Sequence, residues 1–365
     1  PILDRLVGTC DSTCQSGLYD SAVAAQAGHK LSIQTDIIKW VHIELFKKIF
    51  GAAETIPYDV DRFVSLQGKT VTYSTLAQLL SDSLTKSLCG STIDALDEMF
   101  QAYKPLVQKH FGTELEAKDA ECLPTNSCVD LATSNLMDLL LFAGGLSVPG
   151  GISTGLWVLH ADSSAYGDMF PQGYKLSSDD TKGLLFYYEA LRFFAPVVGF
   201  PWWTTPPAVA TDDTKGQFSE GSKRKVLNLA MAQKDPNAWG ADSHKFRVRT
   251  LQEYKDKFVG FANQAVDSTV ANGAMNRACP AIDLAMQMGK AWFSAHDQDG
   301  WCTQDTPTYK EATPFVDAFT LFKGKKPGAS CTPQVNPWSD SECCSGSCSW
   351  VRSSWWRGSW KCSSS

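Results

Sequence analysis

Cysteine is unevenly distributed along this chain of 365 residues, and its distribution divides the sequence into two parts. Five of the twelve cysteines fall within residues 331–365, which also hold many serines and tryptophans. Such density is typical of small secreted modules that have little hydrophobic core and are stabilised by disulfides. We therefore expect a main domain at 1–322, a linker at 323–330 and a disulfide-rich module at 331–365, in a secreted protein or another oxidising compartment.

The charge and hydropathy of the chain exclude two classes of partner. A net charge of −6 and a pI near 5.6 argue against nucleic acids and anionic membrane surfaces, which both require a positive face. No stretch approaches the roughly 20 apolar residues that cross a bilayer, so no transmembrane segment is expected. Pro1 in place of an initiating Met indicates a processed or trimmed end.

Helical periodicity predicts a mainly α-helical chain with small β elements. In TDIIKWVHIELFKKIFG, apolar residues recur every three or four positions after Asp36, which we expect to cap the helix. Strand-like alternation is scarce, and the sequence after residue 196 is rich in Pro, Gly and Trp, which predicts irregular structure and short hairpins. Further amphipathic helices are expected at about 73–87, 91–111, 129–145 and 280–295.

The stretch NRACPAIDLAMQMGKAW places Cys279 just before the last of these helices. Two interpretations are open: the cysteine is half of a disulfide, or it is a thiolate ligand of a metal. If it is a ligand, eleven cysteines remain, and one of them must be free or paired with another chain. The six histidines show no metal-binding spacing, and the chain has no Gly-x-Ser-x-Gly motif of a serine hydrolase.

Three stretches taken together bear on this choice. The first is YYEALRFFAPV, with Glu189 and Arg192 three residues apart on one helix face, and the second is AMAQKDPNAWGADSHKFRVRT. With the Cys279 segment they resemble, in order and spacing, the landmarks of the cytochrome P-450 superfamily. The resemblance implies a P-450-like helical haem domain in which Cys279 is the proximal thiolate ligand of haem b. It also implies a buried structural triad of Glu189, Arg192 and Arg249, with Arg247 as the alternative third member.

One branch of that superfamily fits better than the others. KFVGFANQAVDSTVANGAMNRACPAID is similar to the allene oxide synthase and hydroperoxide lyase branch, which lengthens the loop before the cysteine. Asn276 and Arg277 match the Asn-Lys positions of that loop in the branch, and the resemblance implies that Arg277 binds a haem propionate. Residues 143–145 would leave room for a ligand above the iron, so Ala143 and Gly144 are candidate catalytic residues together with Ser147.

The same helix carries an argument about the reaction. Oxygen-activating members use an acid followed by an alcohol to deliver protons to dioxygen, and here Leu146 stands at the acid position and Ser147 at the alcohol position. A substrate that already contains an O–O bond needs neither this relay nor a reductase. We therefore expect an enzyme that rearranges or cleaves fatty-acid hydroperoxides, with a peroxygenase or peroxidase that uses hydrogen peroxide as the alternative.

The sequence also departs from the family. Ala281 stands where a glycine is usual, and Leu141 falls where the lyase branch places a substrate-binding Asn. The resemblance covers roughly residues 35–300, so the first sheet and helices of the family are missing, and we expect a second chain or subunit to cover that side. A further alternative is a secreted structural or carbohydrate-binding protein that has kept the fold.

The tryptophans of the C-terminal module allow two interpretations. Flat aromatic faces stack on sugar rings, so the module is a candidate polysaccharide-binding unit. The same side chains could instead form the core of the module or dock on the main domain. The tryptophans concerned are Trp338, Trp350, Trp355, Trp356 and Trp360.

Overall fold

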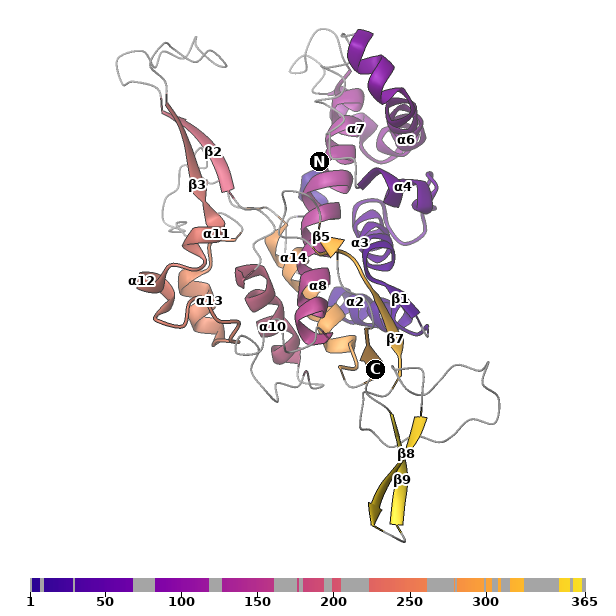
Figure 1. Cartoon of the computed structure of the whole chain (residues 1–365). Coiled ribbons are helices and arrows are strands. Elements are labelled where there is room, and N and C mark those ends of the chain that lie inside the picture. Colours follow the sequence, from indigo (N-terminus) through magenta and orange to yellow (C-terminus); the bar gives the residue numbers. More distant parts are fainter. Residues whose placement is uncertain are drawn as a thin grey trace.

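The computed structural model of the chain is mainly helical, with short strands at its edges (Figure 1). It describes residues 2–6, 10–28, 30–67, 83–117, 127–160, 176, 180–193, 199–204, 223–260, 279, 281–298, 300–303, 308–309, 316–324, 348–354 and 357–362. The helices are α1 (Ile2–Leu6), α2 (Ser12–Ala25), α3 (Ile33–Phe50), α4 (Val60–Gln67), α6 (Ser83–Glu116), α7 (Cys128–Asp138), the π-helix η2 (Leu139–Ala143), α8 (Gly144–His160), α10 (Asp180–Phe193), α11 (Leu229–Ala232), α12 (Pro236–Trp239), α13 (Leu251–Lys257) and α14 (Ile282–Ala295).

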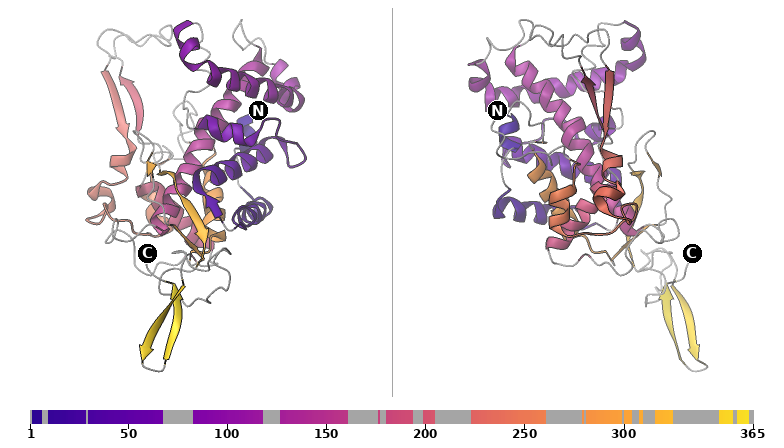
Figure 2. Two further views of the ribbon diagram at one scale, coloured as in Figure 1. Left: turned by 45° about the vertical axis from the view of Figure 1, so that its right-hand side comes forward. Right: turned by 90° about the vertical axis from the view of Figure 1, so that its left-hand side faces the viewer.

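Five helices from distant parts of the sequence form the centre of the core. α8 packs against α3, α10 and α14, and α2 packs on the other side of α14. The buried face of α14 carries Trp292, whose ring lies 5.0 Å from that of Trp40 on α3. Both views of Figure 2 show α8 running through the middle of this bundle.

All strand pairs in the described part of the chain are antiparallel. A three-stranded sheet in the order β1-β7-β4 lies beside α3, with Leu31 opposite Leu321. The remaining strands form two-stranded ribbons, and the β8–β9 hairpin extends away from the helical body (Figure 1). The strands are β1 (Lys30–Ser32), β2 (Gly199–Thr204), β3 (Lys223–Asn228), β4 (Trp301–Cys302), β5 (Thr308–Tyr309), β6 (Val316–Ala318), β7 (Thr320–Lys323), β8 (Cys348–Ser354) and β9 (Arg357–Cys362).

The mainly α-helical fold class is confirmed, while three helix boundaries differ from expectation. α3 begins at Ile33, and Asp36 lies within its first turn, where its carboxylate accepts the N–H of Ser32 at 2.7 Å. Two separate helices were expected at 73–87 and 91–111. From residue 83 onward this prediction is wrong, because a single helix, α6, runs unbroken through Gly90 and Pro105. Residues 73–82 lie outside the described residues.

The helix expected to end at residue 145 instead continues as α8 to His160. It passes through Pro149, which lacks the N–H of a helical hydrogen bond. The buried apolar face of α8 explains why the helix persists, since Val148, Ile152 and Leu156 are all part of the core. Helix propensity is a weak signal compared with such burial.

Candidate functional site

Cys279 lies two residues before Ala281, the N-cap of α14. Among the cysteines whose side chains the structure describes, it is the one with a free thiol, whereas Cys10 and Cys14 form a disulfide and Cys128 is also disulfide-bonded. The thiol is half-buried, and this burial raises its pKa, while the N–H of Ala281 hydrogen-bonds to the sulfur and acts in the opposite direction. The geometry therefore offers a sheltered sulfur with one backbone donor already directed at it.

The carboxylate of Glu189 on α10 is the centre of a buried hydrogen-bond network. Arg192 binds both of its oxygens, with Nη2 2.6 Å from Oε1 and Nε 2.8 Å from Oε2. The guanidinium of Arg249 donates to Oε1 at 2.8 Å, and the backbone N–H of Arg247 donates to the same oxygen at 2.8 Å. Tyr254 on α13 donates its hydroxyl to Oε2 at 2.8 Å. The side chains of Glu189, Arg192 and Arg249 have no exposed surface, so this charge cluster is shielded from water.

Backbone carbonyls satisfy the remaining N–H groups of Arg192. Its Nη1 donates to the carbonyl oxygens of Gln233 and Ser243, and its Nη2 donates to that of Lys245, all at 2.7–2.8 Å. A buried charge is tolerated only when it is paired and hydrogen-bonded, and here both conditions hold. The network thus fastens residues 233–249 onto α10.

Trp239 at the end of α12 completes this segment. The guanidinium carbons of Arg192 and Arg249 lie 5.2 and 5.5 Å from the centre of its buried ring, in cation–π range. Asp235 caps α12 by accepting the N–H of Asn237, with Pro236 at the first helical position. The Asp-Pro pair in the sequence therefore serves to start a short helix that delivers Trp239 to the two arginines.

The structure resolves the choice between Arg249 and Arg247. The side chain of Arg249 reaches Glu189, whereas that of Arg247 is exposed and pairs with Asp242. Tyr254 is a member of the network that sequence reasoning missed. Its signal was weak: the capping box of Thr250 and Glu253 fixes the start of α13 and thereby directs Tyr254 inward.

α10 connects this network with the helix that follows Cys279. Its other side faces α14, where the ring of Phe186 lies 4.9 Å from that of Phe293 and Tyr187 packs against Gly289. α10 is therefore held on one side by the buried charges and on the other by α14.

The residues proposed for the distal side lie on the continuous helical stretch formed by α7, η2 and α8. Ala143 ends the π-helix η2, a type of distortion that is frequent at functional sites. The space for a ligand that we expect above the iron stays a prediction. A Cβ at Gly144 would lie 2.8 Å from Cδ1 of Leu45 on α3. Gly144 therefore serves close packing of α8 on α3. Ser147 is half-buried on α8.

Two further candidates, Asn276 and Arg277, lie outside the described residues. Within the described part of the chain, no three His, Cys, Asp or Glu side chains are grouped to hold a metal ion among themselves. No described helix is both long and apolar enough to cross a membrane.

No family model and no curated protein sequence matches the chain. Solved structures do. One is HmtN, a post-tailoring hydroxylase involved in himastatin biosynthesis, with a TM-score of 0.55 and 13% identity, covering 88% of this chain and 78% of that chain. P450BioI, solved in complex with an acyl carrier protein ligated to hexadec-9Z-enoic acid, gives a TM-score of 0.55 and 14% identity with the same coverage. Cytochrome P450 CYP109Q5 from Chondromyces apiculatus gives a TM-score of 0.55 and 13% identity, covering 86% of this chain and 72% of that chain.

The chain has the cytochrome P450 fold. This confirms the fold that the motifs around Glu189 and Cys279 implied. The sequence identity to these structures is 13–14%, which carries no information about the substrate. The similarity to the allene oxide synthase and hydroperoxide lyase branch stays a prediction. So does the independence of the C-terminal module, of which the structure describes the β8–β9 hairpin.

Proposed function

We propose that this protein is a haem-thiolate enzyme that rearranges or cleaves fatty-acid hydroperoxides without a reductase. The observation that carries the proposal is the free, half-buried thiol of Cys279 at the start of α14, in a chain with the cytochrome P450 fold. The buried Glu189 network supports it, because this network fastens residues 233–249 onto α10, and α10 packs on the helix that begins beside the thiol.

The residues present fit a haem b group held through sulfur. A thiolate ligand needs hydrogen-bond donors and exclusion of water, and the N–H of Ala281 together with the partial burial of Cys279 supplies both. A haem bound in this way would supply an iron that receives electron density from the thiolate and favours O–O cleavage. Arg277 is the proposed partner of a propionate group, with Asn276 beside it.

The choice of a hydroperoxide rests on the composition of α8. Its seventeen residues contain no Asp or Glu, so no carboxylic acid on this helix can pass a proton to dioxygen. Leu146 takes the acid position, and Ser147 beside it offers a hydroxyl group. A hydroperoxide brings its own O–O bond and needs no such delivery, so the absence of the acid does not hinder it.

We also propose a location and two kinds of partner. The Cys10–Cys14 disulfide and the bonded Cys128 support an oxidising compartment and hence secretion. Trp350 lies opposite Trp360 in the β8–β9 hairpin, which supports a polysaccharide as a ligand of the C-terminal module. A second chain or subunit is proposed to cover the side on which the resemblance lacks its first sheet and helices.

The decisive experiment combines spectroscopy with turnover on the full chain, supplied with haem during expression. We expect the red-shifted CO band of a thiolate-ligated haem, and consumption of a linoleic acid hydroperoxide without any electron donor. Cys279→Ser should abolish both, while Glu98→Gln on the exposed face of α6 should change neither. Equal consumption by wild type and Cys279→Ser would refute the proposal. Turnover with hydrogen peroxide alone would indicate the peroxygenase, and failure to bind haem would indicate the structural or carbohydrate-binding alternative.

A further inference from the structure

The N-terminal turn closed by the Cys10–Cys14 disulfide is bonded to the first turn of α14. The backbone N–H of Cys10 donates to Oδ2 of Asp283 at 2.7 Å, across 273 residues of sequence. Cys10 is 4% exposed and Asp283 is half-buried, so water has limited access to this bond, whose acceptor is a carboxylate. Asp283 is the second residue of α14 and stands four residues after Cys279.

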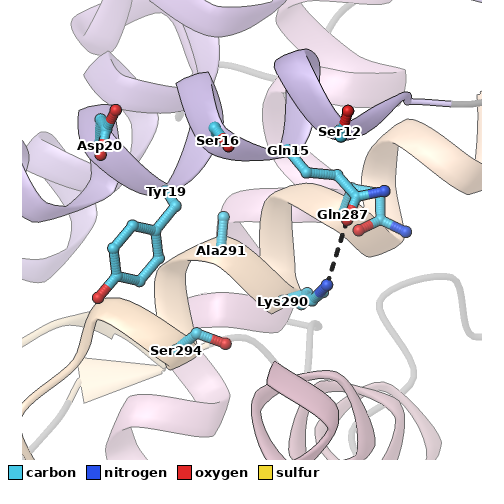
Figure 3. A pocket seen from close by; sticks show the side chains of 9 residues that line it. All are labelled: Ser12, Gln15, Ser16, Tyr19, Asp20, Gln287, Lys290, Ala291 and Ser294. Atoms are coloured by element: carbon cyan, nitrogen blue, oxygen red, sulfur yellow. Dashed lines mark hydrogen bonds between the residues drawn. The ribbon is translucent and has the colours of Figure 1, made fainter. Parts of the chain in front are cut away.

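A second contact ties the same turn to the same helix. Gln15 donates its amide N–H to the carbonyl of Cys10 at 2.8 Å, and its Oε1 accepts the ammonium of Lys290 at 3.3 Å. Figure 3 shows this bond between α2 and α14, in an open polar groove of about 480 Å³. Asp283 and Lys290 are seven residues apart, or about two helical turns, so both contacts lie on one side of α14.

We propose that Asp283 and the Cys10–Cys14 turn are positioning elements for Cys279. The role of this positioning in catalysis rests on the function proposed above, whereas the contacts themselves are independent of that proposal. From Asp283 the connection to the sulfur is short: Ala281 donates its N–H to the sulfur, and Ile282 donates its N–H to the carbonyl of Cys279 at 3.3 Å. A movement of the first turn of α14 would therefore displace both backbone N–H groups that orient Cys279.

The disulfide and the carboxylate have complementary effects. The disulfide closes a loop with a sequence separation of 4, which removes conformational freedom from Cys10 and keeps its N–H directed at α14. The carboxylate of Asp283 lies in the first helical turn, where a negative charge interacts favourably with the unpaired N–H groups of the helix. Ligand groups must be held to within about 0.5 Å of their working position, so contacts that fix the first turn of α14 serve this requirement.

The test measures the exposure of Cys279 directly, in full-length protein prepared without haem. The rate of its alkylation by iodoacetamide is followed by peptide mass spectrometry at fixed pH. We expect Asp283→Asn to raise this rate about tenfold, since the N–H of Cys10 exchanges a charged acceptor for a neutral amide oxygen and the bond is weakened. The Cys10→Ser/Cys14→Ser double variant should raise it as well, and because it changes no charge, a change in the thiol pKa cannot explain that effect. Asp283→Glu should restore most of the protection.

Asp36→Asn is the matched control. Its carboxylate accepts the N–H of Ser32 at the same distance of 2.7 Å, but in the first turn of a different helix, α3. The proposal is overturned if Asp283→Asn and wild type are alkylated at the same rate, or if Asp36→Asn accelerates alkylation equally. If the protein binds no haem but Asp283→Asn accelerates alkylation, the proposed haem-thiolate function is refuted and the positioning role of Asp283 is supported. If the protein binds haem normally but Asp283→Asn has no effect, the positioning role is refuted and the proposed function is not.

Discussion

Arg192 and Arg249 donate to the same carboxylate oxygen of Glu189, at 2.6 and 2.8 Å. The backbone N–H of Arg247 reaches that oxygen too, so Oε1 serves three donors from two separate segments. Because the two arginine side chains are fully buried, neither can turn to water if Glu189 is lost. The carboxylate is therefore the point at which the segment around residues 233–249 is joined to α10.

Replacing Glu189 by Gln should be strongly destabilising. The amide cannot carry the charge that balances two buried guanidinium groups, and breaking such a pair costs about 3–5 kcal/mol. We expect that loss in the free energy of unfolding, measured by urea denaturation, together with reduced haem retention. Glu98→Gln is the control, since its exposed pair with Arg62 should contribute less than about 1 kcal/mol. Equal losses in the two variants would show that the network does not stabilise the fold.

Tyr254→Phe tests the hydroxyl group that sequence reasoning missed. This hydroxyl donates to Oε2 of Glu189 and accepts the N–H of Arg249 at 3.0 Å. Its removal leaves the buried N–H of Arg249 without its partner and takes one of two donors from Oε2 of Glu189, so the free energy of unfolding should fall by about 1–3 kcal/mol. Tyr188→Phe is a suitable comparison, because its ring stacks on Tyr254 while its hydroxyl is not part of the network. A larger loss for Tyr188→Phe would contradict this account.

Local sequence patterns predicted the helices that have one clear apolar face. α14 lies within the expected 280–295, because its buried residues recur at helical spacing and its first turn is marked by Ala281 and Asp283. The unbroken α6 and the long α8 were not predicted. Gly90 and Pro149 signal breaks locally, and burial across the bundle overrides them only in the folded chain.

The candidate site was predictable to the extent that motifs mark it. The spacing of Glu189 and Arg192, and the segment ending in Arg249, identified side chains that the structure brings together. Tyr254 and the Cys10–Asp283 bond could not be found in this way, because these residues belong to no motif and their partners lie 65 and 273 positions away along the chain. The packing of Gly144 against Leu45 was not predictable either, since a glycine does not reveal which neighbour approaches it.

His42 should make stability depend on pH. It is fully buried on α3, shares a hydrogen bond with the hydroxyl of Tyr103 at 3.0 Å and packs on Phe63, and burial lowers its pKa from 6.5 to about 3. Below pH 6.5 the unfolded chain binds a proton on this residue that the folded chain does not. The free energy of unfolding should therefore fall as the pH falls towards 3, by about 1.4 kcal/mol per pH unit from this group alone.

The contribution of His42 can be isolated by comparing two variants. His42→Gln should be less stable than wild type at pH 7.5, but should lose about 2 kcal/mol less between pH 7.5 and 5.0. His244→Gln, at an exposed position, should keep the pH dependence of the wild type. Urea denaturation at both pH values measures each difference, and identical pH profiles for wild type and His42→Gln would rule out the assignment.

Gly289→Ala and Gly17→Ala should change stability in opposite directions. A methyl group on Gly289 would overlap the ring of Tyr187, which is 1% exposed and cannot move aside in the core between α10 and α14. Overpacking of this kind costs about 1–3 kcal/mol. Gly17 lies within α2 with nothing inside 4 Å of an added Cβ, so alanine should raise the free energy of unfolding by about 0.5–1 kcal/mol through helix propensity. Thermal unfolding of the two single variants checks both signs, and a stabilising Gly289→Ala would mean that α10 and α14 are less closely packed than the structure shows.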